Sequence, residues 1–589
     1  MPDSASGVSM TRLSPYFACK PSVTRNTPSS GPTSSPITTT RRRTTQEGLP
    51  EEGLPEEGPL EQDVPGEGLR EKGLCEKGLR EKGLREEGLP EEGLREEGLR
   101  EEGLLKNRRF VWDILTLAMV ISMSYSGPTG AAEKTIIEST ASIAGDWNGK
   151  LEIGAGMTMP LVFHFKQTES NSYVGSMKSP SQSTKLIDFD QVVISGDEIT
   201  AQIEKIDALF KGRLNKQTGT LTGTWAQRGS SIPLTMARGA YSAPQRPQEP
   251  KAPFPYKTQN IDFKNRDITL AGTLTIPETN ATGKAFPCAI LLHGSGPHDR
   301  DETIFGHKPF LVLADYLTRN GIAVLRYDKR GCAKSTGNYK AATSADFAND
   351  GIAAINYLKT CPTIDPKRIG LIGHSEGGVL APMIGAKEPD DVRFMVLLAA
   401  SAINGEKILL SQIRDLGDGI STPASTKKDL ELATKTYAII KAEPDNEKAF
   451  QKIMAMRKEM GVDKEITDET ERKERDSNIK VSIDMVTGPW YRFFLTHEPE
   501  NDLSKVKCSV LAINGDKDLQ VAADENLPVI KKALEAGGNK NIKIEKVPNI
   551  NHLMQTSSTG HPNEYSKIEE TISPKILKLI TDWIGENSK

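Results

Sequence analysis

Several residue types are scarce in this chain of 589 residues. It has only six cysteines, aromatic residues make up 6% of it and apolar residues 36%, and its formal net charge is -4. The low apolar content predicts that part of the chain does not fold into a core. Because basic residues are not in excess, nucleic acid is not expected as a partner.

The few cysteines do not form a disulfide or metal pattern. Two of them, Cys19 and Cys75, lie in the polar N-terminal part of the chain. The other four show neither close pairing nor metal-ligand spacing: Cys288, Cys332, Cys361 and Cys508. We therefore expect buried free thiols. A disulfide between Cys332 and Cys361 is the alternative if the protein is exported.

Residues 1–105 lack any pattern that builds a helix or a strand. From Gln46 to Leu105 the sequence consists of pentads such as EEGLP and EEGLR, with a glycine at nearly the same place in each. A five-residue period matches neither a helix nor a strand, and each glycine costs a helix roughly 1 kcal/mol. The preceding residues are rich in Ser, Thr, Pro and Arg. We expect 1–105 to be disordered low-complexity sequence, with a binding array as the alternative.

Residues 106–132 resemble a secretory signal. Basic residues precede an apolar stretch that begins at Ile114, and small residues follow it. Because such a signal stands at the start of a chain, we expect translation to begin near residue 105. The favoured interpretation is export to the periplasm or the extracellular space, with cleavage near Ala131 or Ala132. The alternative is a membrane anchor through 110–125, a run that is short for a span and contains an acidic residue.

Residues 140–242 alternate apolar and polar side chains in short runs such as EITAQI and GTLTGTWAQ. A period of two is typical of half-buried antiparallel strands, so we expect a small all-β domain. His164 stands alone in one apolar run and is expected to pack rather than to bind a ligand. The proline-rich segment 243–257 is expected to be a linker.

Residues 258–589 show the pattern of one α/β domain. A hairpin pattern at 261–278 precedes short apolar runs at 288–293, 321–328, 368–374, 393–400, 508–514 and 541–547. Helical patterns lie at 308–319, 345–360, 376–387, 523–537 and 572–585. This alternation predicts a mostly parallel sheet with helices on both faces and a ligand site at the carboxyl ends of the strands.

One serine stands at a junction between a predicted strand and a predicted helix. Residues 373–377, Gly-His-Ser-Glu-Gly, follow the apolar run RIGLI and precede a helical pattern. This is the G-x-S-x-G pattern, in which a strained turn lifts a serine hydroxyl above the sheet at a helix N-terminus. We predict that Ser375 is a nucleophile.

The base and the acid should follow at later strand ends. Of the three downstream histidines, His497, His552 and His561, only His552 directly follows the apolar run 541–547. We therefore predict His552 as the general base. Two aspartates follow the run 508–514, and we favour Asp518 as the acid over Asp516, which would be a natural turn residue.

A glycine-rich loop follows the first apolar run of the domain. It reads HGSGPHDRDE, and it offers backbone N–H groups at a strand end. We predict that the N–H groups of Ser295 and Glu376 form an oxyanion hole. His293 and His298 are expected to shape the loop.

Five motifs together carry a family resemblance: HGSGPHDRDE, LRYDKRGCAKSTG, GLIGHSEGG, PWYRFFL and NGDKDLQV. They resemble the EstD-type bacterial carboxylesterases of the α/β-hydrolase superfamily, which are related to the serine aminopeptidases. The resemblance covers residues 255–587. It implies an α/β-hydrolase fold and ester hydrolysis through an acyl-enzyme, with Ser375, Asp518 and His552 at the triad positions, in the chain order that this fold uses.

Residues 402–500 form an insertion with helical periodicity, at the point where α/β-hydrolases carry a lid. Its aromatic residues Trp490, Tyr491 and Phe494 are candidates for lining the acyl pocket. The alternative is that two or three of the aromatics in this segment pack the lid onto the sheet.

The sequence thus predicts a carboxylesterase that acts on a small-molecule ester. Its mechanism needs no metal or organic cofactor, and no membrane span is expected in the mature protein. Two alternatives remain: a serine peptidase of the same fold that acts on short peptides, and a non-catalytic binding protein whose β domain carries the function.

Overall fold

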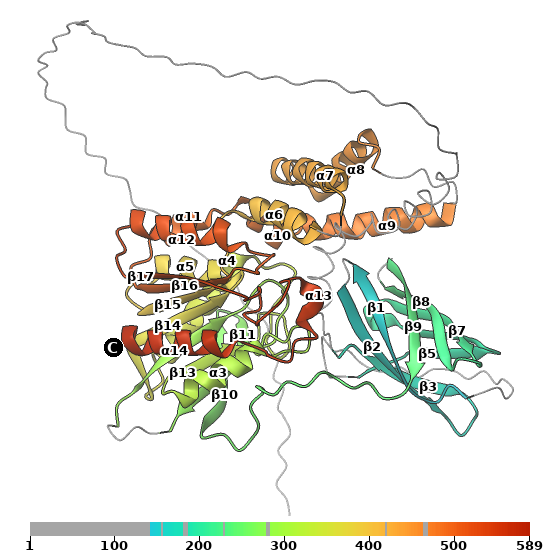
Figure 1. Ribbon diagram of the computed structural model, residues 1–589, viewed down its shortest axis with the longest axis horizontal. Helices are drawn as coiled ribbons and strands as arrows, with labels where there is room; N and C mark the ends of the chain where they lie inside the picture. The colour runs from blue at the N-terminus through green and yellow to red at the C-terminus, as the bar shows by residue number, and fades with distance from the viewer. Residues whose placement is uncertain are drawn as a thin grey trace, which may run out of the picture. The chain divides into compact units, whose positions relative to one another are not determined.

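The computed structural model describes residues 142–589 except 155–156, 181–185, 228–229, 279–282, 419–420 and 463–468. The expectations for 1–105 and 106–132 lie outside these residues. Within the described part of the chain, no helix has both the length and the apolar character that crossing a membrane requires. The described residues form two sheets, one purely antiparallel and one mostly parallel (Figure 1).

The first sheet is antiparallel and has its own core. Its strands are β1 (Gly145–Gly154), β2 (Met157–Gln167), β3 (Tyr173–Lys178), β4 (Ile187–Asp188), β5 (Gln191–Ser195), β6 (Glu198–Ile203), β7 (Ala208–Asn215), β8 (Thr220–Gln227) and β9 (Ser230–Arg238). They are ordered β4-β3-β2-β1-β9-β8-β7-β6-β5. The inward positions carry large side chains such as Trp147, Phe163 and Phe210, all fully buried. Phe163 and Phe210 meet edge to face at 5.4 Å. The outward His164 pairs with Asp146 at 2.6 Å.

The second sheet has the order β10-β11-β13-β12-β14-β15-β16-β17. Its strands are β10 (Tyr256–Asn265), β11 (Ile268–Pro277), β12 (Phe286–Leu292), β13 (Ala323–Tyr327), β14 (Ile364–His374), β15 (Phe394–Leu398), β16 (Ser509–Gly515) and β17 (Ile542–Val547). The hairpin β10–β11 is antiparallel, and β11 pairs with β13 in the same sense. All other pairs are parallel.

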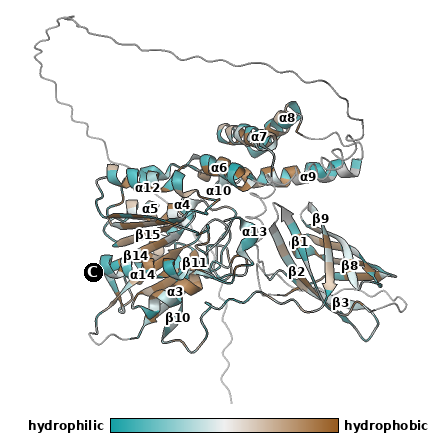
Figure 2. Ribbon diagram, viewed as in Figure 1, coloured by the Kyte–Doolittle hydropathy of each residue, from teal (hydrophilic) through white to brown (hydrophobic). Residues whose placement is uncertain are grey.

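Helices cover both faces of this sheet (Figure 1). One face packs on α4 (Ser344–Leu358), α5 (Gly377–Lys387) and α12 (Ala523–Ala536), and the other on α3 (Pro309–Arg319) and α14 (Pro574–Asn587). Successive residues of a strand face opposite sides, so Cys288 and Ile290 of β12 join the first core while Ala289 and Leu291 join the second. Figure 2 shows hydrophobic residues concentrated in the central strands β14 and β15. The predicted α/β-hydrolase fold is confirmed.

Residues between β15 and β16 form a helical lid with a hydrophobic core of its own. The helices are α6 (Gly405–Gly417), α7 (Pro423–Ala442), α8 (Asn446–Glu459), α9 (Glu469–Val486), α10 (Pro489–Thr496) and α11 (Pro499–Leu503). Ile413, Tyr437, Ile453 and Tyr491 are buried together in this core. Tyr491 therefore packs the lid.

The segment before β10 is bound to the domain: the Arg246 guanidinium donates to the carbonyl oxygens of Gly306, Ser566 and Ile568 at 3.1, 2.8 and 3.0 Å. The four described cysteines are free thiols, so the alternative disulfide is not formed.

Candidate active site

Ser375 lies in a strained turn between β14 and α5. Its φ is 53°, in the left-handed region that non-glycine residues rarely adopt. The flanking glycines are required because the backbone leaves no room for a side chain. A Cβ on Gly373 would lie 2.0 Å from the carbonyl oxygen of Gly377, and a Cβ on Gly377 would lie 2.0 Å from that of Leu292. This close packing of turn, strand and helix holds the serine at the end of the sheet.

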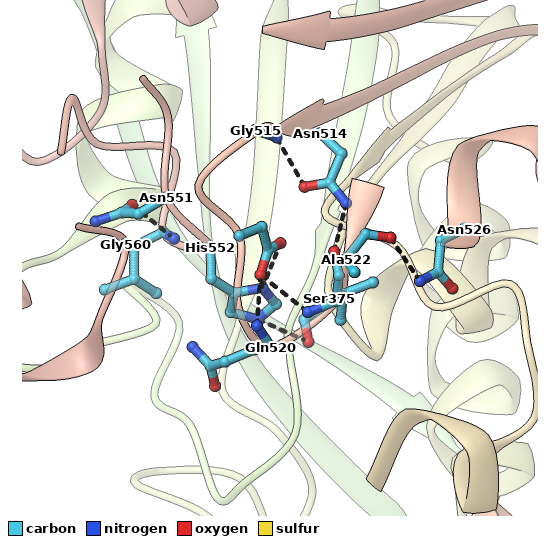
Figure 3. A network of polar contacts seen from close by, with 12 residues as sticks. Ser375, Asn514, Gly515, Gln520, Ala522, Asn526, Asn551, His552 and Gly560 are labelled. Carbon is cyan, nitrogen blue, oxygen red and sulfur yellow. Dashed lines mark hydrogen bonds and ion pairs between the residues drawn. The ribbon is translucent and has the colours of Figure 1, made fainter. Parts of the chain in front are cut away.

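His552 and Asp518 stand next to this serine. His552 Nε2 is 3.2 Å from Ser375 Oγ, and His552 Nδ1 is 2.9 Å from Asp518 Oδ2 (Figure 3). The His552 and Asp518 side chains are only 7% and 0% exposed. A carboxylate only accepts hydrogen bonds, so Nδ1 carries the proton and the lone pair of Nε2 faces the serine hydroxyl. The arrangement is therefore suited to general-base activation of Ser375.

The loop after β16 fixes the Asp518 carboxylate. Asp518 Oδ1 accepts the N–H groups of Gln520 and Val521, both at 2.9 Å. Asn514 closes the loop, since its Nδ2 donates to the Val521 carbonyl at 2.7 Å (Figure 3). Asp516 is exposed and accepts the N–H of Asn549 at 2.6 Å. The structure thus brings Asp518 to the imidazole and leaves Asp516 in the turn.

The other two downstream histidines have different partners. His497 lies 3.2 Å from Asp502 and stacks on Phe493. His561 accepts a hydrogen bond from the N–H of Asn563 and caps a short helix, α13 (Pro562–Tyr565). His552 is the histidine that meets Ser375.

Residues 293–296, which we name the oxyanion loop for its predicted role, follow β12 and approach Ser375 closely. A Cβ on Gly294 would lie 3.3 Å from the Cβ of Ser375. The Gly294 N–H is already used, because it donates to Glu302 Oε1 at 2.6 Å. By contrast, the N–H groups of Ser295 and Glu376 make no hydrogen bond to any residue that the structure describes. Both N–H groups are therefore available to stabilise an oxyanion.

The two histidines of this loop region are buried. Burial lowers the pKa of His293 to about 3, so its imidazole is neutral near pH 7, and it packs at 5.0 Å from the ring of Phe310. His298 Nε2 lies 2.7 Å from the Ser295 carbonyl oxygen. This contact helps to orient the loop.

Two buried ion pairs flank the nucleophile, and the sequence motifs gave no indication of them. His374 Nδ1 lies 3.1 Å from Glu302 Oε1, and Lys329 Nζ lies 2.9 Å from Glu376 Oε2. Burial works to raise the pKa of Glu302, but the charge and hydrogen bond of His374 oppose it and hold that pKa at about 2. Burial works to lower the pKa of His374, but the Glu302 carboxylate raises it above its usual value.

The lid meets the nucleophile region through α10. Trp490 Nε1 donates to Glu376 Oε1 at 2.6 Å, and its ring stacks on Phe494 at 5.0 Å. Phe494, Ile403 and Val379 line a small cavity of about 10 Å³ beside Glu376, room for about one water molecule. Tyr491 is 3% exposed, and its ring packs 6.4 Å from that of Tyr437 inside the lid. Among the described residues, no group of three His, Cys, Asp or Glu side chains could hold a metal ion.

Parts of the chain are similar to known proteins. The family model described as "Serine aminopeptidase, S33" matches residues 307–556, which include Ser375, Asp518 and His552. Esterase EstD of Thermotoga maritima is 26% identical over 329 residues, which are 55% of this chain and 68% of that protein. The uncharacterized protein YfhR of Escherichia coli K12 is 26% identical over 147 residues, 25% of this chain and 48% of YfhR.

A solved structure is also similar to part of the chain. Est1E from Butyrivibrio proteoclasticus, with ferulic acid bound, is 16% identical with a TM-score of 0.33, and the match covers 56% of this chain and 98% of Est1E. The resemblance to EstD-type esterases that the motifs predicted is confirmed by the match to EstD itself.

Proposed function

We propose that the protein is a carboxylesterase, a serine hydrolase that cleaves carboxylic esters through an acyl-enzyme. The observation that carries this proposal is the alignment of Ser375 Oγ, His552 Nε2 and Asp518, with contacts of 3.2 and 2.9 Å, on a turn with a φ of 53°. The similarity to a protein named as an esterase supports esters as the substrate class.

In the proposed mechanism, each group has one step. Ser375 Oγ attacks the ester carbonyl carbon while its proton passes to His552 Nε2. The carbonyl electron pair moves onto the oxygen, and the N–H groups of Ser295 and Glu376 stabilise that oxyanion. The C–O bond to the alcohol then breaks, and His552 protonates the leaving oxygen. Asp518 orients the imidazole and stabilises its cation.

Deacylation repeats these steps with water in place of the serine. His552 Nε2 removes a proton from a water molecule, and the water oxygen attacks the acyl carbon. The tetrahedral intermediate collapses with release of Ser375 Oγ, which regains its proton from His552. The products are a carboxylic acid and an alcohol, and His552 transfers the proton in each step.

A peptidase activity is the second candidate, because the matching family model is described as a serine aminopeptidase. An aminopeptidase must bind a free ammonium group near the nucleophile, which requires an available acceptor. Glu376 is the carboxylate next to Ser375 in the sequence, but its oxygens already accept from Lys329, Ser344 and Trp490. These contacts favour the ester over the aminoacyl substrate.

The test compares p-nitrophenyl esters of increasing acyl length with aminoacyl p-nitroanilides, using purified wild-type protein and Ser375→Ala as the control. We expect ester turnover that disappears in the variant, and little anilide turnover. Faster cleavage of the anilides than of the esters would overturn the proposal in favour of the peptidase. Equal turnover by wild type and Ser375→Ala would overturn the assignment of the nucleophile.

We also propose that the protein is exported, on the strength of the signal-like sequence at 106–132. The chain recovered from its native host should then begin close to Ala131. Intact-mass analysis tests this, and a mass that still contains the pentad repeats would reject it.

A further inference from the structure

The two sequence neighbours of the nucleophile, His374 and Glu376, are both tied to the oxyanion loop by a buried partner of opposite charge. His374 pairs with Glu302, and Glu376 pairs with Lys329. Glu302 and Lys329 each make a second contact, to the backbone of Gly294. The loop is therefore held from two sides by charges that also contact the nucleophile turn.

On the first side, Glu302 links the loop to the catalytic base. Its Oε1 accepts the Gly294 N–H at 2.6 Å and faces His374 Nδ1 at 3.1 Å. The other ring nitrogen, His374 Nε2, lies 3.0 Å from the carbonyl oxygen of His552. Because both ring nitrogens face atoms that can only accept, both must donate, and His374 is an imidazolium. One ion pair thus spans the oxyanion loop and the backbone of the base.

On the second side, Lys329 determines which way the Ser295 amide points. Lys329 Nζ donates to the carbonyl oxygens of Gly294 and Gly296 at 2.8 and 3.2 Å and to Glu376 Oε2 at 2.9 Å, which uses all three of its protons. In a trans peptide the C=O of Gly294 and the N–H of Ser295 point in opposite directions. By holding that C=O, Lys329 turns the Ser295 N–H away from itself.

We propose that Glu302 and Lys329 are positioning residues that clamp the oxyanion loop to the two neighbours of Ser375, and so aim the Ser295 N–H at the developing oxyanion. This inference rests on the proposed ester hydrolysis. It assigns a function to the HDRDE and DKRG motifs, which contribute no side chain to the triad itself. A misaimed donor weakens binding of the transition state more than binding of the substrate.

The chain offers a matched control for Lys329 in the next residue. Arg330 is also a buried cation in an ion pair, since its Nε donates to Asp350 Oδ2 at 2.7 Å and its side chain is 9% exposed. Its hydrogen bonds go to Asp350 and Asp346 and not to residues 293–296. Lys329→Met and Arg330→Met each leave a buried carboxylate without its cation, but only Lys329→Met removes hydrogen bonds to the oxyanion loop.

The experiment measures kcat and KM on p-nitrophenyl acetate, the thermal midpoint, and the inhibition constant of an alkyl trifluoromethyl ketone. The ketone forms a reversible hemiketal: Ser375 Oγ bonds to its carbonyl carbon, the serine proton passes to His552, and the electron pair becomes an oxyanion. For Lys329→Met we expect kcat to fall about 10- to 100-fold with KM little changed, part of the effect of one lost oxyanion donor. The inhibition constant should rise by a similar factor.

Arg330→Met should lower the thermal midpoint by a comparable amount but leave kcat and the inhibition constant near wild type. Should Lys329→Met fail to fold, Glu302→Gln provides the same comparison, with a smaller loss of kcat because its amide oxygen can still accept from Gly294. The proposal is overturned if the loss of kcat simply follows the loss of thermal stability across these variants. It is also overturned if the inhibition constant does not change.

The two proposals fail in different ways. If wild type binds the ketone but hydrolyses no ester, the proposed function is wrong, and the clamp is then judged on the inhibition constants alone. If wild type hydrolyses esters and Lys329→Met does so at the same kcat, the clamp is wrong and the function stands.

Discussion

Replacing Asp518 by Asn should separate its charge from its place in the loop. Asp518 Oδ1 accepts the N–H groups of Gln520 and Val521 at 2.9 Å and lies 3.1 Å from His552 Nδ1, whereas Oδ2 makes the shorter contact to Nδ1, at 2.9 Å. An asparagine would keep its oxygen where two N–H groups need an acceptor, so its NH2 group would face Nδ1. Nδ1 must then accept, and the proton moves to Nε2, the atom that faces Ser375.

The histidine in that tautomer has no lone pair for the serine proton. We expect kcat on p-nitrophenyl acetate to fall about 10,000-fold, the cost of the wrong tautomer in a serine triad. That factor corresponds to about 5 kcal/mol of transition-state stabilisation. Because the hydrogen bonds to the loop backbone are kept, the thermal midpoint should change little, and this distinguishes the tautomer effect from unfolding.

Asp516→Asn is the matched control. Asp516 is exposed, and Oδ1 is the atom that accepts the Asn549 N–H, a contact that an asparagine oxygen can keep. Its kcat should remain close to that of wild type. If Asp516→Asn lost more turnover than Asp518→Asn, or if Asp518→Asn kept most of its activity with an unchanged midpoint, the assignment of the acid would be wrong.

Three further predictions concern the nucleophile, the lid and His307, a buried histidine whose ring nitrogens lie 3.0 Å from Thr571 Oγ1 and 2.9 Å from the Tyr565 carbonyl oxygen. Ser375→Ala and His552→Ala should each remove most turnover with non-additive effects, and a fluorophosphonate should label the peptide containing Ser375; labelling of Ser375→Ala at the wild-type rate would refute this. Trp490→Ala removes the ring stacked on Phe494, which lines the small cavity, so we expect it to shift preference toward longer acyl groups more than it changes the rate on acetate. Equal loss on all esters together with a lower thermal midpoint would instead indicate packing. Burial, and then the charge of Arg246, lower the pKa of His307 from 6.5 to about 4, so the unfolded chain binds the extra proton and stability falls as pH drops from 6.5 through 4. Measured by urea unfolding, the free energy of unfolding of His307→Gln should fall less steeply over that pH range than that of wild type, by up to about 1.4 kcal/mol per pH unit. Identical slopes for the two proteins would contradict a lowered pKa of His307 in the folded state.

The sequence predicted the strand ends, and with them the positions of the candidate triad residues, because short apolar runs mark buried parallel strands directly. It did not predict the clamp. Glu302 and His374 are 72 positions apart, and Lys329 and Glu376 are 47 apart, so nothing local in the sequence indicates that these charges pair. Such pairs depend on how the loops at neighbouring strand ends meet, which a single sequence does not encode in any periodic pattern.

The lid aromatics show a case where a finer use of periodicity could have helped. On helix α10, Trp490 and Phe494 are four residues apart and their rings stack. Trp490 donates to Glu376, and Phe494 lines the small cavity beside that residue. Tyr491 and Leu495 share the adjacent face and are buried in the core of the lid. Positions i and i+4 lie on one face of a helix, so the segment PWYRFFL divides into a pair beside Glu376 and a pair that packs inside the lid.

The contacts of Arg246 determine where a shortened protein can begin. A fragment cut at the start of β10 would contain the complete sheet and the triad, yet it would remove the donor to the carbonyl oxygens of Gly306, Ser566 and Ile568. It would also remove Gln248, whose side chain accepts from the N–H groups of Thr571 and Ile572. Each group left unpaired where water cannot reach it costs about 1–3 kcal/mol. Expression of an isolated catalytic fragment should therefore start upstream of Arg246, inside the proline-rich segment, rather than at the first strand.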